Sequence, residues 1–340
     1  MFFESEPIHY ATSSMFPSGG FDPFGQPVKP GLGPEYLMSD SGALSPTFGA
    51  STHGSGLTAA TGSSAAAPAP SLVGSAGGLQ FDLIWDPSVA NAPSGFVQAV
   101  KSAAQYLASL FSTKEVVNID VGYGEIAGSP LGSGALGESE SYGYLANYAA
   151  VTSVLRGDGY NFVASNEPTS SQFFITSAET KAFGYVNPSS SALDGYVGFS
   201  SAYPMDYATS GSVPSNQYDL YSIAEHELTE VMGRIGVEGA IMNGAKTYTP
   251  LDLFNYSRPG ALELSANGGY FSTNNGVTNL GAYNDAAANG GDIADWASSV
   301  ANNSFDAFTA PGTAGALTSN DVLEVAALGY RLSALGSSVA

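Results

Sequence analysis

The chain contains no cysteine, and this absence removes several classes of protein from consideration. Without a thiol among its 340 residues, disulfide bonds, thiolate zinc sites and cysteine nucleophiles are excluded. Positive charge is also scarce, because nine Lys and Arg face thirty Asp and Glu, for a formal net charge of -21. Such an acidic surface repels nucleic acid phosphates and anionic lipid headgroups, so we expect neither as a partner.

Long apolar runs are missing too. No uninterrupted run approaches the roughly 20 residues that a membrane-spanning helix needs, so we expect no membrane insertion. Near the N-terminus, Glu4 and Glu6 stand where a signal peptide carries Lys or Arg, and no apolar segment follows them. Together with the high content of Gly, Ser, Ala and Asn, this predicts a secreted protein exported without an N-terminal signal. A cytoplasmic location is the alternative.

Residues 1–78 have the composition of a flexible leader. They are rich in Gly, Pro, Ser and Ala, and they end in a low-complexity stretch from Gly54 to Gly78. Such a segment buries too little apolar surface to offset the entropy lost on ordering. We therefore predict a leader over residues 1–78 and a single folded domain over residues 79–340.

The pattern after residue 79 predicts strand, helix and strand in succession. Residues 81–85 read as a strand, and residues 117–123 alternate between apolar and polar side chains. Between them, a stripe with helical spacing follows Ser94, the expected N-cap; its members are Phe96, Val100, Ala103, Leu107 and Leu110. This order opens an α+β or α/β layered domain.

Further elements follow along the chain. An apolar run at residues 173–175 and a strand at 195–199 are expected, with helices at 177–183, at 219–233 and after Ser319, where Gly329 ends the last helix. The residues Asn274, Asn275 and Gly276 predict the turn of a hairpin between residues 270–273 and 277–280.

Histidine is nearly absent from the predicted domain. Of three histidines, only His226 lies outside the leader, in the run His226-Glu227-Leu228-Thr229-Glu230. Side chains at i and i+4 lie one above the other on a helix, so His226 and Glu230 can hold one ion, while Glu227 can reach a water beside it. The alternative is an ordinary amphipathic helix on which Glu230 pairs with Arg234.

Several segments together resemble a known family. They are HELTEVMGR at 226–234, YTPLDLFNYS at 248–257 and GDIADW at 291–296, with shorter pieces at 121–124 and 194–200. This set is similar to bacterial secreted zincin-like metallopeptidases that carry HExxE where relatives carry HExxH, and the resemblance covers residues 80–335. It implies a zincin fold, with a twisted sheet over a long helix and the active-site helix beneath, and it implies a protein or peptide substrate. It also implies zinc, with His226 and Glu230 as ligands and Glu227 as general base.

The third metal ligand is less evident. Gly236 stands where metzincins place a ligand, and glycine cannot coordinate through a side chain. Asp252, one loop beyond the helix and about where gluzincins place a carboxylate, is the first candidate, although it could equally cap a turn after Pro250. One imidazole with two carboxylates is a hard ligand set, so zinc is expected with calcium or manganese as alternatives.

Two other acidic residues offer oxygen ligands. Asp292 and Asp295 lie among Asn and Gly residues and could bind calcium, but a solvated loop explains them as well. The sequence as a whole predicts a metal-dependent, zinc endopeptidase in which Glu227 is the general base. The alternative function is a secreted structural or adhesive module on a zincin scaffold, with degenerate or no catalysis.

Overall fold

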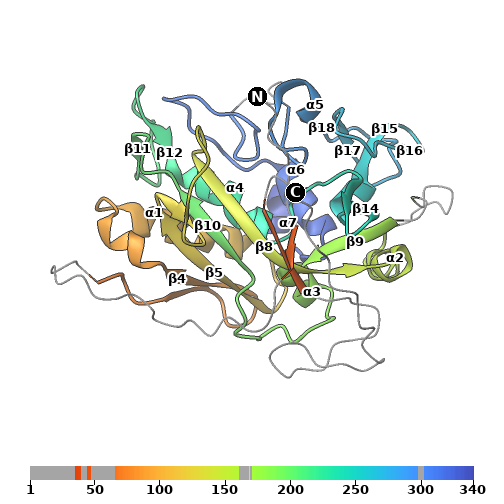
Figure 1. The fold of residues 1–340 in the computed structure, drawn as a ribbon, viewed down its shortest axis with the longest axis horizontal. Helices are drawn as coiled ribbons and strands as arrows, with labels where there is room; N and C mark the ends of the chain where they lie inside the picture. The colour runs from red at the N-terminus through yellow and green to blue at the C-terminus, as the bar shows by residue number, and fades with distance from the viewer. Residues whose placement is uncertain (1–34, 40–43, 47–65, 161–167, 169–170, 298–301) are drawn as a thin grey trace.

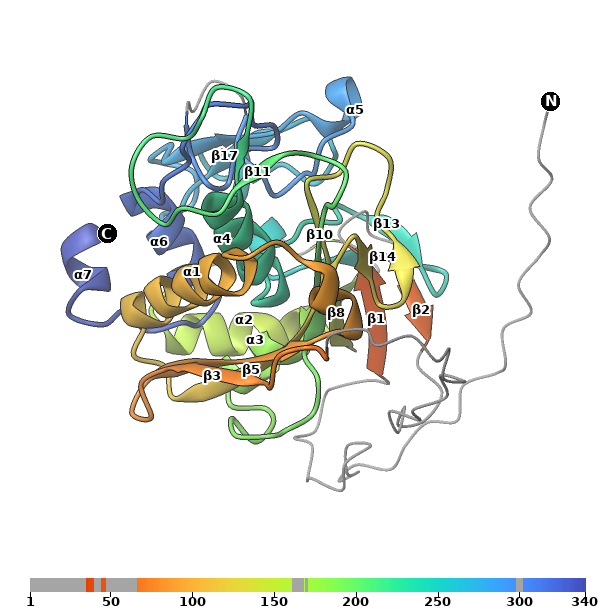
Figure 2. The ribbon, with the colours of Figure 1, turned by 90° about the vertical axis from the view of Figure 1, so that its left-hand side faces the viewer.

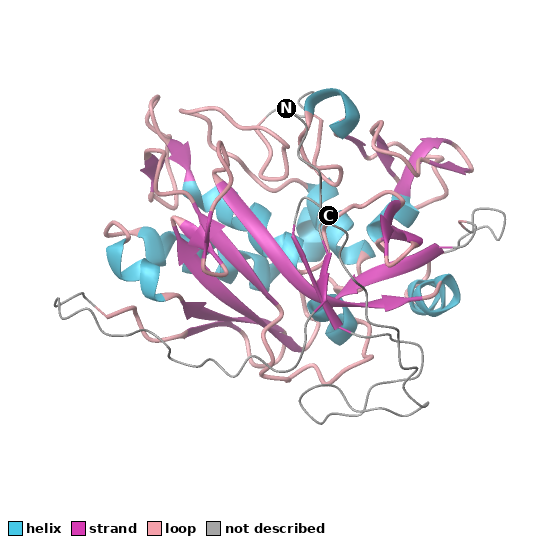
Figure 3. Cartoon of the chain, viewed as in Figure 1, coloured by secondary structure: helices cyan, strands magenta, loops and turns pink. Residues whose placement is uncertain are grey.

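The computed structural model describes residues 35–39, 44–46, 66–160, 168, 171–297 and 302–340. These residues form an α+β architecture in which helices pack against a large mixed sheet (Figure 1; Figure 3). The predicted α+β class is confirmed.

The centre of the main sheet is parallel. β4 (Leu79–Trp85), β5 (Glu115–Tyr123) and β10 (Gly195–Phe199) run in one direction, and β8 (Gly137–Ala146) lies antiparallel beside β10. β9 (Ser171–Thr176) pairs with the same edge of β8 as β10 does: β10 pairs with residues 137–141 and β9 with residues 143–146. The sheet then continues through β14 (Ala245–Tyr248) to β13 (Ala240–Met242).

Parts of the predicted leader belong to this sheet. β3 (Ser71–Gly74) pairs antiparallel with β4, and β1 (Glu35–Ser39) pairs antiparallel with β8 and with β2 (Leu44–Pro46). The folded part therefore begins before residue 79. Residues 1–34, 40–43 and 47–65, the rest of the predicted leader up to Ala65, lie outside the described residues.

Two helices cover the same face of the sheet and pack against each other (Figure 2). α1 (Phe96–Leu110) buries the whole predicted apolar stripe, and α4 (Leu220–Val231) is the predicted helix with the histidine. The expected N-cap of α1 is corrected from Ser94 to Gly95. Gly95 has φ 104°, and a Cβ there would lie 2.9 Å from the Cβ of Tyr207, so glycine is required at this entry.

The remaining elements surround this core. The other helices and 3-10 turns are η1 (Pro87–Asn91), α2 (Tyr148–Gly157), α3 (Ser177–Ala182), η3 (Leu251–Phe254), α5 (Ala286–Asn289), α6 (Ser319–Ala327) and α7 (Gly336–Val339). A second sheet has the order β16 (Ala261–Leu262), β15 (Asn255–Arg258), β17 (Gly269–Phe271) and β18 (Gly281–Tyr283). Two short pairs join β6 (Glu125–Ile126) to β7 (Ser129–Pro130) and β11 (Met205–Asp206) to β12 (Tyr218–Asp219).

The predicted hairpin is present, but its strands lie further from the turn than expected. β17 and β18 pair from Gly269 with Tyr283 to Phe271 with Gly281, so residues 272–280 form the connection. Asn275 and Gly276 both have positive φ, as the Asn-Gly turn requires. The connection is held by side-chain hydrogen bonds instead of a strand ladder: Ser272 donates to Asn274, while Ser272 and Asn274 accept the N–H groups of Gly276 and Thr278.

Within the described ranges, no helix combines the length and apolar character that crossing a membrane demands.

Candidate metal centre

The end of α4 sets the geometry of the candidate site. Asp219 caps the helix at its start by accepting the N–H of Tyr221 at 3.1 Å. After Val231 the chain turns at Gly233, which has φ 115° and whose Cβ would lie 2.6 Å from Cδ of Glu179. Only glycine fits such a position, and the turn carries Arg234 back over the end of the helix.

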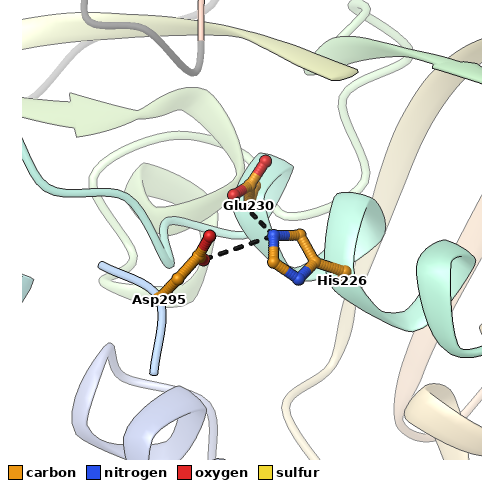
Figure 4. Close-up of side chains that lie close together, drawn as sticks. All are labelled: His226, Glu230 and Asp295. Carbon is orange, nitrogen blue, oxygen red and sulfur yellow. Dashed lines mark ion pairs between the residues drawn. The ribbon is translucent and has the colours of Figure 1, made fainter. Parts of the chain in front are cut away.

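Three side chains with metal-binding atoms converge beside α4. His226 Nε2 lies 3.2 Å from Glu230 Oε1 and 3.2 Å from Asp295 Oδ1, and each of the three residues offers a donor atom within 4.8 Å of the others. Figure 4 shows both carboxylates approaching the same ring nitrogen, one from α4 and one from the loop that holds Asp295. The sequence predicted the first two members and placed Asp295 only among weaker calcium candidates.

The other ring nitrogen of His226 is fixed. Nδ1 lies 2.9 Å from the carbonyl oxygen of Ser304, which can only accept, so Nδ1 carries the proton and donates. In a neutral imidazole this leaves a lone pair on Nε2, directed at Glu230 and Asp295. A metal-binding histidine commonly has its second nitrogen held by a carbonyl in this way.

A buried guanidinium joins the two carboxylates. Arg234 is 0% exposed; its Nη1 donates to Asp295 Oδ1 at 2.7 Å and its Nη2 to Glu230 Oε1 at 3.3 Å. The guanidinium also lies 4.2 Å above the ring of Phe305. The i,i+4 pair of Glu230 and Arg234 that the sequence offered as an alternative is thus present, together with the metal-binding arrangement.

Asp295 reaches the site because the next residue anchors its loop. Trp296 is 1% exposed, stacks on Tyr283 with ring centroids 5.1 Å apart and donates its indole N–H to Asp321. Its backbone N–H bonds the carbonyl of Phe305 at 2.8 Å. Burial of the indole therefore holds the carboxylate of Asp295 at the end of α4.

The same face of α4 meets strand β8. Ser139 donates its hydroxyl to Glu230 Oε2 at 2.9 Å, which leaves Oε1 directed at His226. Glu227 is 6% exposed, and a Cβ at Gly137 would come within 2.4 Å of its Oε1. Glu227 therefore faces the beginning of β8, and it does not belong to the three-residue donor group.

Charge balance shapes the protonation of the cluster. Burial opposes the charged form of His226, but Asp295 and Glu230 outweigh it and raise the pKa of His226 well above its ordinary value. Burial raises the pKa of Asp295, yet His226 and Arg234 outweigh that effect and the pKa is lowered overall. Without a metal, an imidazolium and a guanidinium therefore face two carboxylates.

Asp252, the predicted third ligand, lies outside this group. It stands in η3 directly after Pro250, and its Oδ2 accepts the N–H groups of Thr249 at 2.8 Å and Glu238 at 3.2 Å. This is the turn-capping role that the sequence left open. The structure brings Asp295, and not Asp252, together with His226 and Glu230.

The spacing of the donor atoms is compatible with a small metal ion. Ligands roughly 2.0–2.2 Å from a tetrahedral ion lie roughly 3.3–3.6 Å apart. The two separations of 3.2 Å at His226 Nε2 are close to this range, although they also suit charged hydrogen bonds. The imidazole is 13% exposed and the carboxylates 3%, so His226 is the most accessible of the three side chains.

Comparisons with models of protein families, with curated proteins and with solved structures give no match for this chain. The metallopeptidase resemblance therefore stays a prediction.

Proposed function

We propose that the protein is a metal-dependent peptidase, with zinc as the expected ion held by His226, Glu230 and Asp295. The observation that carries the proposal is the convergence of two carboxylates on one imidazole nitrogen, which together make three donor groups, while Ser304 fixes the other nitrogen. The arrangement also supports the zincin-like fold that the resemblance implies, because an antiparallel strand, β8, passes directly over the helix with the histidine.

The ligand set indicates which ions are suitable. Zinc accepts imidazole nitrogen and carboxylate oxygen in a four-coordinate site, and three protein ligands leave one position open. Two carboxylates and one imidazole also suit manganese, and calcium less well because it prefers six or more oxygen ligands. The positive charge of Arg234 offsets part of the negative charge of the two carboxylates. The set therefore attracts a highly charged cation less strongly than two carboxylates alone would.

The residues around the ion would have separate roles in catalysis. A bound metal would polarise the scissile carbonyl and lower the pKa of a water molecule. Glu227, beside the donor group without belonging to it, would accept the proton of that water and return it to the leaving amine. Arg234 and Ser139 would hold the two carboxylates in place, so that neither has to reorganise when substrate arrives.

A second candidate function rests on Arg234. Its guanidinium already compensates Glu230 and Asp295, and an imidazolium at His226 completes the balance of charges. Such a cluster requires no metal and would make the domain a structural or adhesive module. For both functions, the acidic, cysteine-free composition supports a secreted location.

The test is metal content and peptide cleavage of the purified full chain and its variants. We expect about one metal per chain, lost in Glu230→Gln and Asp295→Asn. Glu227→Gln should keep the metal while cleavage falls by roughly 100-fold or more. Glu138→Gln is the matched control, since Glu138 lies on β8 beside Ser139, but its carboxylate accepts the N–H of Gly132 and does not belong to the donor group.

Absence of metal from the wild-type chain after incubation with zinc, manganese or calcium would rule out the peptidase. Unfolding of Glu230→Gln and Asp295→Asn with no metal in any sample would instead favour the structural cluster. Metal binding without cleavage of any peptide would leave a metal site and remove the catalytic role of Glu227.

A further inference from the structure

Strand β1 lies along an edge of β8 that the central sheet leaves open. Met38 pairs with Ser141 on one side of β8 while Gly195 of β10 pairs with Ser141 on the other. Likewise, Tyr36 and Thr176 of β9 take opposite sides of Gly143. Figure 2 shows β1 beside β8, toward β13 and β14. Apart from β2, which pairs with β1, the described strands of the sheet would therefore keep their pairing if β1 were removed.

The side chains of β1 fill a pocket of their own. Met38 is 1% exposed and Tyr36 is 8% exposed, and they belong to a second apolar cluster, separate from the main core. The walls of this cluster are Phe174, Ile235, Val237 and Met242, with Leu145 packed against it. The phenol of Tyr36 accepts the amide N–H of Asn243 at 2.6 Å. Successive side chains of a strand point to opposite faces, so one face of β1 supplies both anchors.

The pocket is continuous with the candidate metal centre. On β8, Glu140 pairs with Ser39 of β1. The preceding residue, Ser139, donates its hydroxyl to Glu230 of the candidate metal centre. On the other side, Ile235 follows Arg234 directly. The edge of β8 and the segment after α4 thus line the groove that β1 fills, and both elements continue directly into residues of the candidate metal centre.

We propose that this groove is a binding site for an extended peptide and that residues 35–39 occupy it as an internal ligand. The groove consists of the β8 edge at residues 140–144 and the pocket of Phe174, Ile235, Val237 and Met242. Its ligand is an antiparallel strand with an aromatic and a long aliphatic side chain two residues apart, as in Tyr36-Leu37-Met38. Main-chain bonds to a strand edge supply affinity, and alternate side-chain pockets supply specificity.

The consequence for activity rests on the proposed function. If the centre hydrolyses peptides, residues 35–39 compete with substrate for the strand edge beside it. A segment of the same chain binds at a higher effective concentration than a free peptide does, so a free peptide competes poorly while the segment is bound. Residues 35–39 would then inhibit peptide hydrolysis by the same chain.

The experiment measures binding of a fluorescently labelled peptide with the sequence of residues 33–41 to the full chain. All proteins carry Glu227→Gln so that the peptide stays intact. Met38→Asn removes an anchor from the internal segment and should increase the apparent affinity for the added peptide by at least about 30-fold. Leu37→Asn is the matched control, because Leu37 is half-buried on the opposite face of the same strand, and it should bind the peptide as weakly as the parent.

A peptide in which methionine is replaced by asparagine should not bind to any of the proteins. Equal binding of the intact peptide to all three folded proteins would overturn the proposal and make β1 a fixed strand of the sheet. Should Met38→Asn fail to fold, a protease recognition sequence placed within residues 52–58 replaces it. After cleavage, excess added peptide should displace the N-terminal fragment on a sizing column, and a fragment that resists displacement contradicts the proposal.

These readouts need neither metal nor turnover, so the two proposals can fail separately. Peptide binding by a chain that takes up no zinc, manganese or calcium would keep the groove and remove the peptidase. Cleavage of peptides by the wild-type chain, together with no effect of Met38→Asn on binding or rate, would keep the peptidase and remove the groove.

Discussion

Replacement of Arg234 by methionine tests the ion cluster most directly. Arg234 is 0% exposed and contacts Asp295 at 2.7 Å and Glu230 at 3.3 Å. At an effective dielectric constant of about 20, these distances correspond to gross attractions of about 6 and 5 kcal/mol. Burial of the guanidinium offsets much of this. Loss of one partner from a buried ion pair typically costs about 3–5 kcal/mol, and we expect that loss in the free energy of unfolding.

The assay is urea denaturation of the full chain without metal and with added zinc. Arg258→Met is the matched control, since Arg258 is exposed, and it should change the free energy of unfolding by less than about 0.5 kcal/mol. Zinc at about 100 times its dissociation constant should restore about 2.7 kcal/mol to Arg234→Met. An Arg234→Met chain as stable as the wild type would refute the cluster geometry, and a destabilised chain that zinc does not rescue would favour the structural module.

Three further predictions address other parts of the molecule. Asp252→Asn should retain full metal content, measured by elemental analysis, because Asp252 caps a turn outside the donor group. Burial, with Asp86 and Glu125, raises the pKa of Asp120 to about 7. A carboxyl group with a raised folded pKa costs stability above its unfolded pKa, so the midpoint of urea unfolding should fall between about pH 4 and 7, and Asp120→Asn should flatten this fall. Gly137→Ala should lower peptide cleavage without loss of metal, since its Cβ displaces Glu227.

Local patterns in the sequence were sufficient for the main elements. The five residues of the α1 stripe are all buried, and so are Val322, Val325 and Leu328 at the closing helix. Helical and strand periodicity depend on neighbours within a few positions, so a single sequence contains them. Pairing between distant strands has no such local signal, and the antiparallel addition of β1 to β8 was not predicted.

The candidate site shows the same difference between local patterns, which the sequence contains, and tertiary contacts, which it does not. His226, Glu227 and Glu230 lie within one turn of one helix, and their spacing pointed to a shared ion. Asp295 joins them across 65 residues of sequence through the burial of Trp296, an event of tertiary packing. Asp252 was closer in sequence to the helix, yet its carboxylate is used by backbone N–H groups at the start of η3.

Strand β8 explains how carboxylates of α4 can reach the sheet at all. Its sequence, GESESYGYLA, places Gly137, Ser139, Ser141 and Gly143 at alternate positions. Ser139, Ser141 and Gly143 are buried, and Gly137 lies against Glu227. The alternate positions carry Glu138, Glu140 and Tyr142 toward the other face. Because small residues face the helix, α4 approaches closely enough for Glu227 and Glu230 to contact the strand, where larger side chains would hold the helix away.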